Sequence, residues 1–541
     1  MGSRVIMALI LAGVILSLWG TVMVVQADSG STQELLPDAF VAPDLPTGIL
    51  RLAATSPVTP GYYQTSEYMA GSVAVGIVLV QSDGSVDPST EHWTAEEKQR
   101  VYNKIVAATH WWASLEPRAH LSFVFDDHFS NPLPTRVEPI TRPYTDMGYW
   151  IADAMGALGY SAPSYLTRVR DYTNQLRVTY HTDWAFTIFV VDSSNDRDGQ
   201  FSGGYFAFAC LGGPLLVMTY NNGGYGPDNM DIVAAHEMGH IFYALDQYPS
   251  ALQPCTIHSG YLSVENQNSG YGSCTLNVSS IMRNPMMAYP DKAIDPYAAG
   301  QIGWRDSDGD SILDPLDTEL PVGITTISQT SNSVMVSGTA EIVPYPSPTR
   351  PNVTINTLTG VRYRFDKGDW QQATADDGAF DGTTEGYHFA ASPRPGRYAL
   401  EVAALDSAGN VSAIYATGVI TVLDPIDGGL ITQLYSPSSA ISAGKGITLS
   451  GEAFQLNGST VANVQYRVNG GPWRPAQAQD GAFDSDDEPF SLILDSLPAG
   501  THLIEARATD VNGKTEVNFA SQPVTVKVYT TFLPMVMSSF D

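Results

Sequence analysis

Two histidines four residues apart flank a glutamate in the segment DIVAAHEMGHIFYALDQYPS, which spans residues 231–250. Residues four apart lie one above the other on a helix, so His236 and His240 can bind one metal ion. Glu237 follows the first histidine and can reach a water in the open coordination position of that metal. This pattern is typical of zinc hydrolases, in which the glutamate takes the proton of the attacking water.

A catalytic zinc needs three protein ligands and one open position, so a third ligand must lie near the helix. Asp246 stands ten residues after His236, and a carboxylate oxygen is an acceptable zinc ligand at that place. The chain must then leave the helix soon after His240 and turn back. We expect the helix to begin near Asp228 or Asp231, whose carboxylates suit its N-terminal cap and dipole. Three other residues remain rivals for the third ligand: His258, Glu265 and Asp295.

At these residues the sequence resembles the metzincin zinc proteases, whose motif is H-E-x-x-H-x-x-G-x-x-H with aspartate as third ligand in some members, such as the snapalysin group. That family also carries a methionine in a tight turn under the zinc, and SSIMRNP at 279–285 supplies Met282 for this Met-turn. The resemblance covers residues 66–304. It implies an α+β metzincin-like catalytic domain, with a mixed twisted sheet and an active-site helix, that binds Zn²⁺ and uses Glu237 as general base. An extended peptide substrate would align along the edge strand that follows residue 203.

One position departs from the family pattern, since Tyr243 stands where the motif has the glycine that permits the bend. A tyrosine with positive φ is costly. Either the bend is made differently, for example at Ala244, or the third ligand is not Asp246. Asn284 occupies the place where family members often carry a tyrosine, so Tyr289 and Tyr248 are the candidates for a tyrosine that assists the oxyanion.

The elements that position this motif follow from hydrophobic patterning. SVAVGIVLVQ at 72–81 is a continuous apolar run and predicts a buried strand. A long helix begins at a capping box of Thr94 and Glu97. The other elements before the motif are predicted as strands at 120–127 and 185–194, helices at 146–159 and 163–176, and two strands within 203–224 around Gly212 and Gly213. A short helix at 295–304 ends this α+β region.

An acidic loop, DSDGDSILDPLD, follows at 306–317 and carries carboxylates at its positions 1, 3, 5, 9 and 12. Calcium loops place ligands at these positions and a backbone carbonyl at position 7. The predicted ligands are Asp306, Asp308, Asp310, Ile312 through its carbonyl, Asp314 and Asp317. The loop resembles those of EF-hands, dockerins and thrombospondin type 3 repeats, with Ser311 in place of glycine at position 6. We expect residues 305–320 to bind a structural Ca²⁺; the alternative is a solvated acidic linker.

The remaining chain repeats itself. VRYRFDKGDWQQATADDGAFD at 361–381 aligns with VQYRVNGGPWRPAQAQDGAFD at 464–484, an offset of 103 residues. A period near 100 residues with alternating strands is typical of immunoglobulin-like or fibronectin-type sandwiches. We therefore predict two all-β Ig-like sandwiches at 321–424 and 425–530, followed by an apolar tail at 531–541 that forms a final strand.

The N-terminus and the cysteines indicate export. One basic residue precedes an apolar run from Val5 to Val25, so residues 1–27 are either a cleaved signal peptide or a retained signal-anchor. Residues 28–65 are predicted as a linker or short propeptide. Export permits a disulfide between Cys255 and Cys274, whereas Cys210 in YFAFACLGG is expected to be a small buried hydrophobe.

Composition limits the partners. The formal net charge is −29, which repels nucleic acid and anionic membranes. We expect a secreted or surface-exposed zinc metalloendopeptidase that acts on proteins or peptides, with sandwiches that contact a cell surface or matrix. Two alternatives stay open: a surface binding protein or adhesin with a structural or vestigial zinc site, and a zinc hydrolase of another amide, such as a cell-wall peptide.

Overall fold

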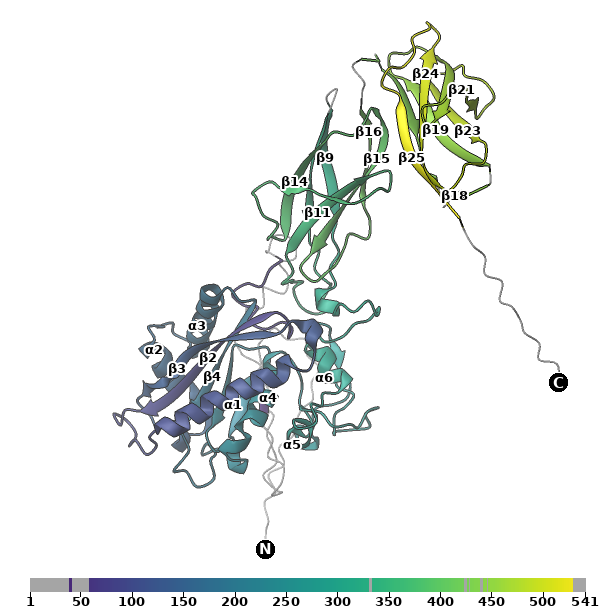
Figure 1. The fold of residues 1–541 in the computed structure, drawn as a ribbon. Coiled ribbons are helices and arrows are strands. Elements are labelled where there is room, and N and C mark those ends of the chain that lie inside the picture. The colour runs from purple at the N-terminus through teal and green to yellow at the C-terminus, as the bar shows by residue number, and fades with distance from the viewer. Residues whose placement is uncertain are drawn as a thin grey trace, which may run out of the picture. The chain divides into compact units, whose positions relative to one another are not determined.

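The computed structural model describes residues 38–40, 58–329, 333–422, 426–427, 429–437, 441–444 and 446–528. The chain divides into two units (Figure 1). The first comprises the chain up to Glu319 together with Val343–Asn356, and the second comprises Leu320–Ile342 and the chain from Thr357 onward. The predicted N-terminal segment 1–27 and the tail 531–541 lie outside the described residues. No helix in the described part is long and apolar enough to cross a membrane.

The first unit is built on a six-stranded mixed sheet in the order β1-β5-β6-β4-β2-β3. Its strands are β1 Asp38–Phe40, β2 Ser72–Ser82, β3 Ser122–Thr135, β4 Trp184–Val191, β5 Ala207–Cys210 and β6 Leu215–Thr219. Strands β2, β3, β4 and β6 are parallel, whereas β5 is antiparallel to β6. The predicted mixed sheet is confirmed. β1 falls inside the predicted linker 28–65, where three residues pair with β5 in parallel instead.

Helices cover both faces of this sheet, which explains why β2, β4, β5 and β6 are apolar without alternation, whereas the edge strand β3 carries several polar residues and is largely half-buried or exposed. They are α1 Ala95–Ala113, α2 Met147–Ala157, α3 Tyr165–Tyr180, α4 Met230–Ile241, α5 Pro285–Ala288 and α6 Pro296–Gln301. The predicted capping box at Thr94 and Glu97 is present at the start of α1. Helices α2 and α3 pack on one face, and α1 packs against α4 (Figure 1). The Trp112 indole of α1 donates to the Ala235 carbonyl of α4. A short hairpin of β7 His258–Ser259 and β8 Val264–Glu265 follows α4.

The second unit contains two β-sandwiches. The sheets of the first are β13-β14-β10-β9 and β12-β11-β15-β16, and those of the second are β17-β19-β23-β22 and β18-β25-β24-β20-β21. The first-sandwich strands are β9 Val322–Gln329, β10 Val334–Glu341, β11 Leu358–Phe365, β12 Gln371–Gln372, β13 Thr374–Ala375, β14 Thr384–Ala391, β15 Gly396–Asp406 and β16 Ala416–Val422. The second-sandwich strands are β17 Leu430–Leu434, β18 Ile441–Ser442, β19 Ile447–Gln455, β20 Val461–Val468, β21 Arg474–Pro475, β22 Gln477–Ala478, β23 Asp487–Leu494, β24 Gly500–Asp510 and β25 Ala520–Lys527. Each sandwich has its own apolar core, so the prediction of Ig-like sandwiches is confirmed.

The sequence repeat is also a structural repeat. Strands β11 and β20 have the same length and begin 103 residues apart, as do β14 and β23. Equivalent side chains also make equivalent contacts. The Arg364 guanidinium lies 4.4 Å from the Trp370 ring centre, and the Arg467 guanidinium lies 4.7 Å from the Trp473 ring centre. The two copies therefore share both backbone pairing and surface contacts.

One part of the predicted first sandwich belongs to the first unit. Residues 343–356 connect β10 to β11, and contain four prolines within VPYPSPTRPNV. Proline has no amide proton for a strand ladder, so this connection cannot extend the sheet. It packs on the first unit instead, where the Tyr261 hydroxyl donates to the Tyr345 carbonyl at 2.6 Å and the Thr354 amide donates to Val58 at 2.7 Å.

Candidate metal centre

The predicted ligands come together in a buried cluster. His236, Glu237 and His240 lie on α4 with no exposed surface, and Asp246 is 1% exposed. Asp246 Oδ1 lies 3.1 Å from Nε2 of each histidine, and the two Nε2 atoms are 3.2 Å apart. The structure thus brings all three predicted zinc ligands to one point.

Backbone carbonyls orient both rings. The Nδ1 atom of His236 lies 2.8 Å from the Ile281 carbonyl oxygen, and that of His240 lies 2.7 Å from the Ala244 carbonyl oxygen. A carbonyl oxygen can only accept, so each Nδ1 donates to its carbonyl and each Nε2 points at Asp246. Two ring nitrogens and a carboxylate oxygen therefore face one another, an arrangement that suits a shared cation.

The geometry and charge fit zinc. Ligand atoms around a tetrahedral zinc with bonds of about 2.0–2.1 Å lie about 3.3–3.4 Å apart, close to the 3.1–3.2 Å between these atoms. Burial alone would raise the pKa of Asp246, but the His240 and His236 rings hold that pKa below its ordinary value, so the carboxylate is ionised. Its second oxygen is buried and has no hydrogen-bond partner among the described residues. One aspartate and two histidines are a zinc donor set.

The bend after the helix is made by Tyr243 itself, which corrects the expectation of a bend at Ala244. Tyr243 has φ +73°. The Ala244 amide donates to the Gly239 carbonyl and the Tyr243 amide donates to the His240 carbonyl. This pair of bonds is a Schellman motif, in which the residue with positive φ is usually glycine. Asp246 is consequently brought back to the histidines although the family glycine is absent.

Packing around the tyrosine ring explains how a non-glycine residue keeps this conformation. Tyr243 is 9% exposed, and the Arg350 guanidinium lies 4.1 Å from its ring centre. Arg350 in turn forms an ion pair with buried Glu67. A Cβ on Gly212 would lie 2.1 Å from the ring, so this glycine makes room for it. Sequence reasoning did not identify Arg350, Glu67 or Gly212, because no local pattern connects them to the motif.

Met282 lies against α4, as the Met-turn prediction requires. A Cβ on Gly239 would lie 2.6 Å from the Met282 sulfur, so any larger residue here would require the Met282 side chain to shift. The Met282 carbonyl accepts from the Gln247 amide at 2.8 Å. This bond connects the Met-turn to the residue next to Asp246.

The three rival ligands, Asp295, His258 and Glu265, lie outside the buried cluster and make other contacts. Asp295 caps α6 by accepting from the Tyr297 and Ala298 amides. His258 and Glu265 face each other across the β7–β8 hairpin, with half-exposed side chains 3.8 Å apart. None of the three belongs to the buried metal group.

Two other expectations near the helix need correction. The N-cap of α4 is Asn229 without a side-chain bond, because the preceding turn carries Asp228 outward to Arg100 and Asp231 pairs with Lys104. Of the two tyrosines considered for the oxyanion, Tyr248 is buried with its ring 6.5 Å from that of His236. Tyr289 stacks on Trp111, and burial together with Asp231 raises its pKa.

The acidic loop gathers only part of its predicted ligand set. Oxygens of Asp306, Asp308 and Asp310 lie within 4.8 Å of one another. Burial, followed by the charges of the neighbouring aspartates, raises the pKa of Asp317, but its oxygens are not among those gathered within 4.8 Å. Asp314 is different, because it is buried and accepts from the Arg305 guanidinium and from Ser307. The contact with Arg305 therefore holds the Asp314 carboxylate, at loop position 9, apart from those of Asp306, Asp308 and Asp310. Arg118 also donates to Asp306 at 2.9 Å.

The cysteine predictions are confirmed. Cys255 and Cys274 form a disulfide. Cys210 is a buried free thiol on β5 whose pKa is raised by burial. The disulfide closes a loop directly after the metal ligands.

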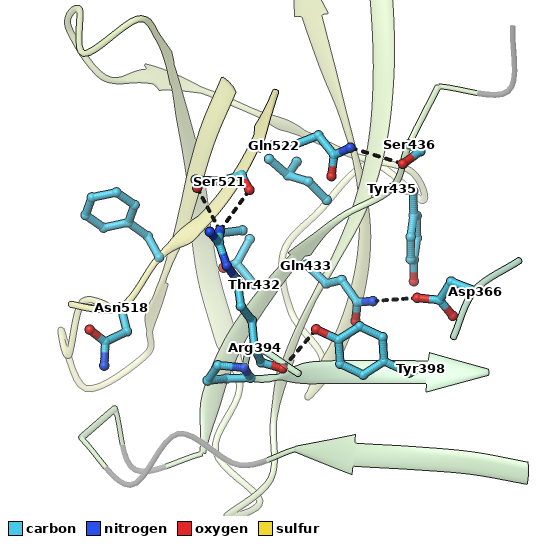
Figure 2. A pocket seen from close by; sticks show the side chains of 14 residues that line it. Asp366, Arg394, Tyr398, Thr432, Gln433, Tyr435, Ser436, Asn518, Ser521 and Gln522 are labelled. Atoms are coloured by element: carbon cyan, nitrogen blue, oxygen red, sulfur yellow. Dashed lines mark hydrogen bonds between the residues drawn. The ribbon is translucent and has the colours of Figure 1, made fainter. Parts of the chain in front are cut away.

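A different kind of hollow lies in the second unit. It has a volume of about 540 Å³ and is lined by residues of both sandwiches (Figure 2). The Arg394 guanidinium donates to Ser521, and the Gln433 amide donates to Asp366 at 3.3 Å. Tyr435 lies among its lining residues, which include no histidine or cysteine. The lining combines these polar side chains with apolar ones such as Leu434 and Phe519.

Comparisons with known proteins leave the family open. No family model matches the sequence, and no curated protein matches it. Among solved structures, the sulfane dehydrogenase SoxCD from Paracoccus pantotrophus is 21% identical over 21% of this chain and 27% of that chain, with a TM-score of 0.15. The fibronectin(III)-like modules of Clostridium thermocellum CbhA are 13% identical over 39% of this chain and 93% of theirs, with a TM-score of 0.14. The PKD domain of an M14-like peptidase from a Thermoplasmatales archaeon is 20% identical over 18% of this chain and 92% of that chain, with a TM-score of 0.15. Likenesses this weak carry no argument, so the description of the sandwiches rests on their strand pairing.

Proposed function

We propose that the first unit is a zinc-dependent endopeptidase of metzincin type, exported to the cell surface or beyond. The observation that carries this proposal is the cluster of two histidine Nε2 atoms and one aspartate oxygen within 3.1–3.2 Å of one another. Three protein ligands leave one coordination position open, which is the arrangement of catalytic rather than structural zinc. Met282 under the helix agrees with the family pattern, and the bend at Tyr243 returns Asp246 to the histidines although the family glycine is absent.

Each residue has a role in this reaction. Zinc, when bound, would polarise the substrate carbonyl and make a water more acidic. His236, His240 and Asp246 would hold the ion, and the Ile281 and Ala244 carbonyls keep the two rings in position. Glu237 takes the proton of the attacking water and passes it to the leaving amine. An extended substrate would pair with β5, where β1 lies in this structure.

The test combines zinc content with casein cleavage. Chains of residues 28–541 are compared as wild type and as Glu237→Ala, with exposed Glu96→Ala as the matched control. We expect one zinc per chain in all three, and a loss of cleavage of about 10²–10⁴-fold in Glu237→Ala alone. A chain that begins at residue 58 tests whether removal of β1 raises activity. Absence of zinc from the wild type would refute the catalytic assignment.

A second function belongs to the sandwiches, and the hollow in the second unit favours it (Figure 2). In this alternative the chain is a surface or matrix binding protein whose zinc site is structural or vestigial. Binding to cell-surface or matrix preparations would then weaken in Tyr435→Ala and remain unchanged in Glu237→Ala. The two functions are compatible in one chain, and the paired variants separate them.

A further inference from the structure

Asp246 differs from the other two proposed ligands in how its backbone is held. His236 and His240 lie on α4, where helical hydrogen bonds fix their backbone. Asp246 lies in the buried segment 244–247, which belongs to no helix or strand. The backbone groups of such a segment need partners from elsewhere in the chain, because buried N–H and C=O groups are costly without them. Those partners decide where the Asp246 carboxylate lies.

Two buried amide side chains act as partners of this segment. The Oε1 atom of Gln301 accepts from the Leu245 amide at 2.8 Å, and the Nδ2 atom of Asn266 donates to the Asp246 carbonyl at 2.9 Å. Neither Gln301 nor Asn266 has any exposed surface. One contact precedes the Asp246 side chain in the chain and the other follows it. Together they restrict the backbone from which the carboxylate projects.

The side chain of Gln301 is also held at its other end. Its Nε2 atom donates to the carbonyls of Val264 and Glu265 at 3.4 and 3.2 Å. Gly260, in the turn of the same β7–β8 hairpin, has φ +78°, and a Cβ there would lie 1.9 Å from the Gln301 carbonyl oxygen. The end of α6 therefore packs directly on the hairpin. Gln301 connects this hairpin to the segment that carries the ligand.

Asn266 follows the hairpin and lies in the loop closed by the disulfide. Its backbone amide donates to the carbonyl of Cys255, one of the two bonded cysteines, at 3.0 Å. The peptide unit between Asp246 and Gln247 is bonded at both ends, because its carbonyl accepts from Asn266 and its amide donates to the Met282 carbonyl at 2.8 Å. The plane of this peptide unit is thus fixed from two directions.

We propose that Asn266 and Gln301 are positioning residues for the third metal ligand, which they hold beside the histidines before the ion binds. This inference rests on the proposed function, because it takes His236, His240 and Asp246 to be zinc ligands. A site that is already ordered binds an ion more tightly than one that must be ordered during binding. The loss of a group that orients a metal ligand typically weakens metal affinity about 10–100-fold.

The test measures the zinc affinity of the full chain by competition with a chelator. Asn266→Leu and Gln301→Met remove the amides and keep side chains of similar size. We expect each variant to bind zinc about 10–100-fold more weakly than wild type. The visible absorption of Co²⁺ in the site, which depends on its ligands, should change in both variants toward that of Asp246→Ala.

Asn268→Leu is the matched control. Asn268 is equally buried and lies in the same loop, but it bonds the Gln247 side chain and the Val278 backbone rather than the Asp246 backbone. This variant tests whether any loss of a buried amide in the loop is sufficient, and its zinc affinity and Co²⁺ spectrum should stay close to those of wild type. An equal loss of affinity in Asn268→Leu would overturn the inference.

Two other results have different meanings. Wild-type affinity and a wild-type Co²⁺ spectrum in both Asn266→Leu and Gln301→Met would overturn the positioning role and leave the proposed metal centre intact. Absence of zinc from the wild type would refute the metal centre itself, and the positioning role with it. The behaviour of the wild type therefore distinguishes failure of the proposed function from failure of this inference alone.

Hydrogen exchange of the zinc-free wild type covers the case in which a variant fails to fold. Since the two amides act before the ion binds, the amide protons of Leu245 and Gln247 should exchange as slowly without zinc as those of α4. Rapid exchange at both positions that slows only when zinc is added would contradict the inference, because the ion would then order the segment.

Discussion

Replacing Tyr243 separates the cost of its backbone conformation from the stabilisation by its ring. A positive φ costs a residue with a Cβ about 1–2 kcal/mol, and the φ here is +73°. Removal of a buried aromatic ring costs about 3–5 kcal/mol, and the loss of the contact with Arg350 adds about 1 kcal/mol. Tyr243→Gly and Tyr243→Ala should therefore both destabilise the first unit by several kcal/mol.

The difference between the two variants is the informative quantity. Glycine avoids the strain, but its greater freedom in the unfolded chain offsets about 0.4–1 kcal/mol of that gain. Tyr243→Gly should thus be more stable than Tyr243→Ala by about 0.5–1 kcal/mol. A urea titration followed by hydrogen exchange of peptides from residues 230–246 measures the free energy of unfolding of the first unit alone. The zinc content of each variant then tests whether the bend still holds Asp246 beside the two histidines.

Tyr248 provides the control, because it is also buried but has an ordinary φ of −76°. At that position glycine should be less stable than alanine, the reverse of the order at Tyr243. If Tyr243→Ala proved as stable as Tyr243→Gly, the positive φ would not be strained and the explanation of the bend would fail.

Three further perturbations test other contacts. Gly239→Ala places a Cβ 2.6 Å from the Met282 sulfur and should lower the free energy of unfolding by about 1–3 kcal/mol through overpacking. Gly239→Ala/Met282→Ala should recover part of this loss, and an unchanged stability in urea for Gly239→Ala would contradict the close contact. Burial raises the pKa of Glu516 to about 7, above its unfolded value, so the second unit should lose about 3 kcal/mol of stability as pH rises from about 4.5 to above 7. Glu516→Gln should make thermal unfolding of that unit independent of pH over this range, and an unchanged pH profile would disprove the assignment. Cys255→Ser/Cys274→Ser removes a disulfide and should destabilise the first unit by about 2–4 kcal/mol without affecting the second, as calorimetry of both transitions would reveal.

Local spacing made much of the metal centre predictable. His236 and His240 are four residues apart on one helix, and Asp246 is close enough in the chain to return to them by a single turn. The repeat was predictable for a similar reason, since Trp370 and Trp473 mark the same place in two copies. These features depend on periodicity and short separations, which a sequence displays directly.

The conformation of Tyr243 was not predictable in this way. Its intrinsic preference argues against a positive φ, and the contacts that overcome this preference come from Gly212 and from Arg350, more than 100 residues further along. In the acidic loop, Asp314 forms an ion pair with Arg305, a contact that the regular spacing of the carboxylates did not indicate. Tertiary packing decided both cases.

The discontinuity of the first unit has a consequence for the order in which the chain is made. The ligand Asp246 is synthesised 110 residues before Asn356, the last residue of the segment that completes this unit. At 5–20 residues per second, ribosomes need about 5–20 s to cover that distance. During this interval the nascent chain holds the three proposed zinc ligands but lacks Arg350, which packs on the Tyr243 ring. The bend at Tyr243 therefore gains this support only after residues 343–356 have been made, and a transcript truncated after α6 would encode the histidines and Asp246 without it.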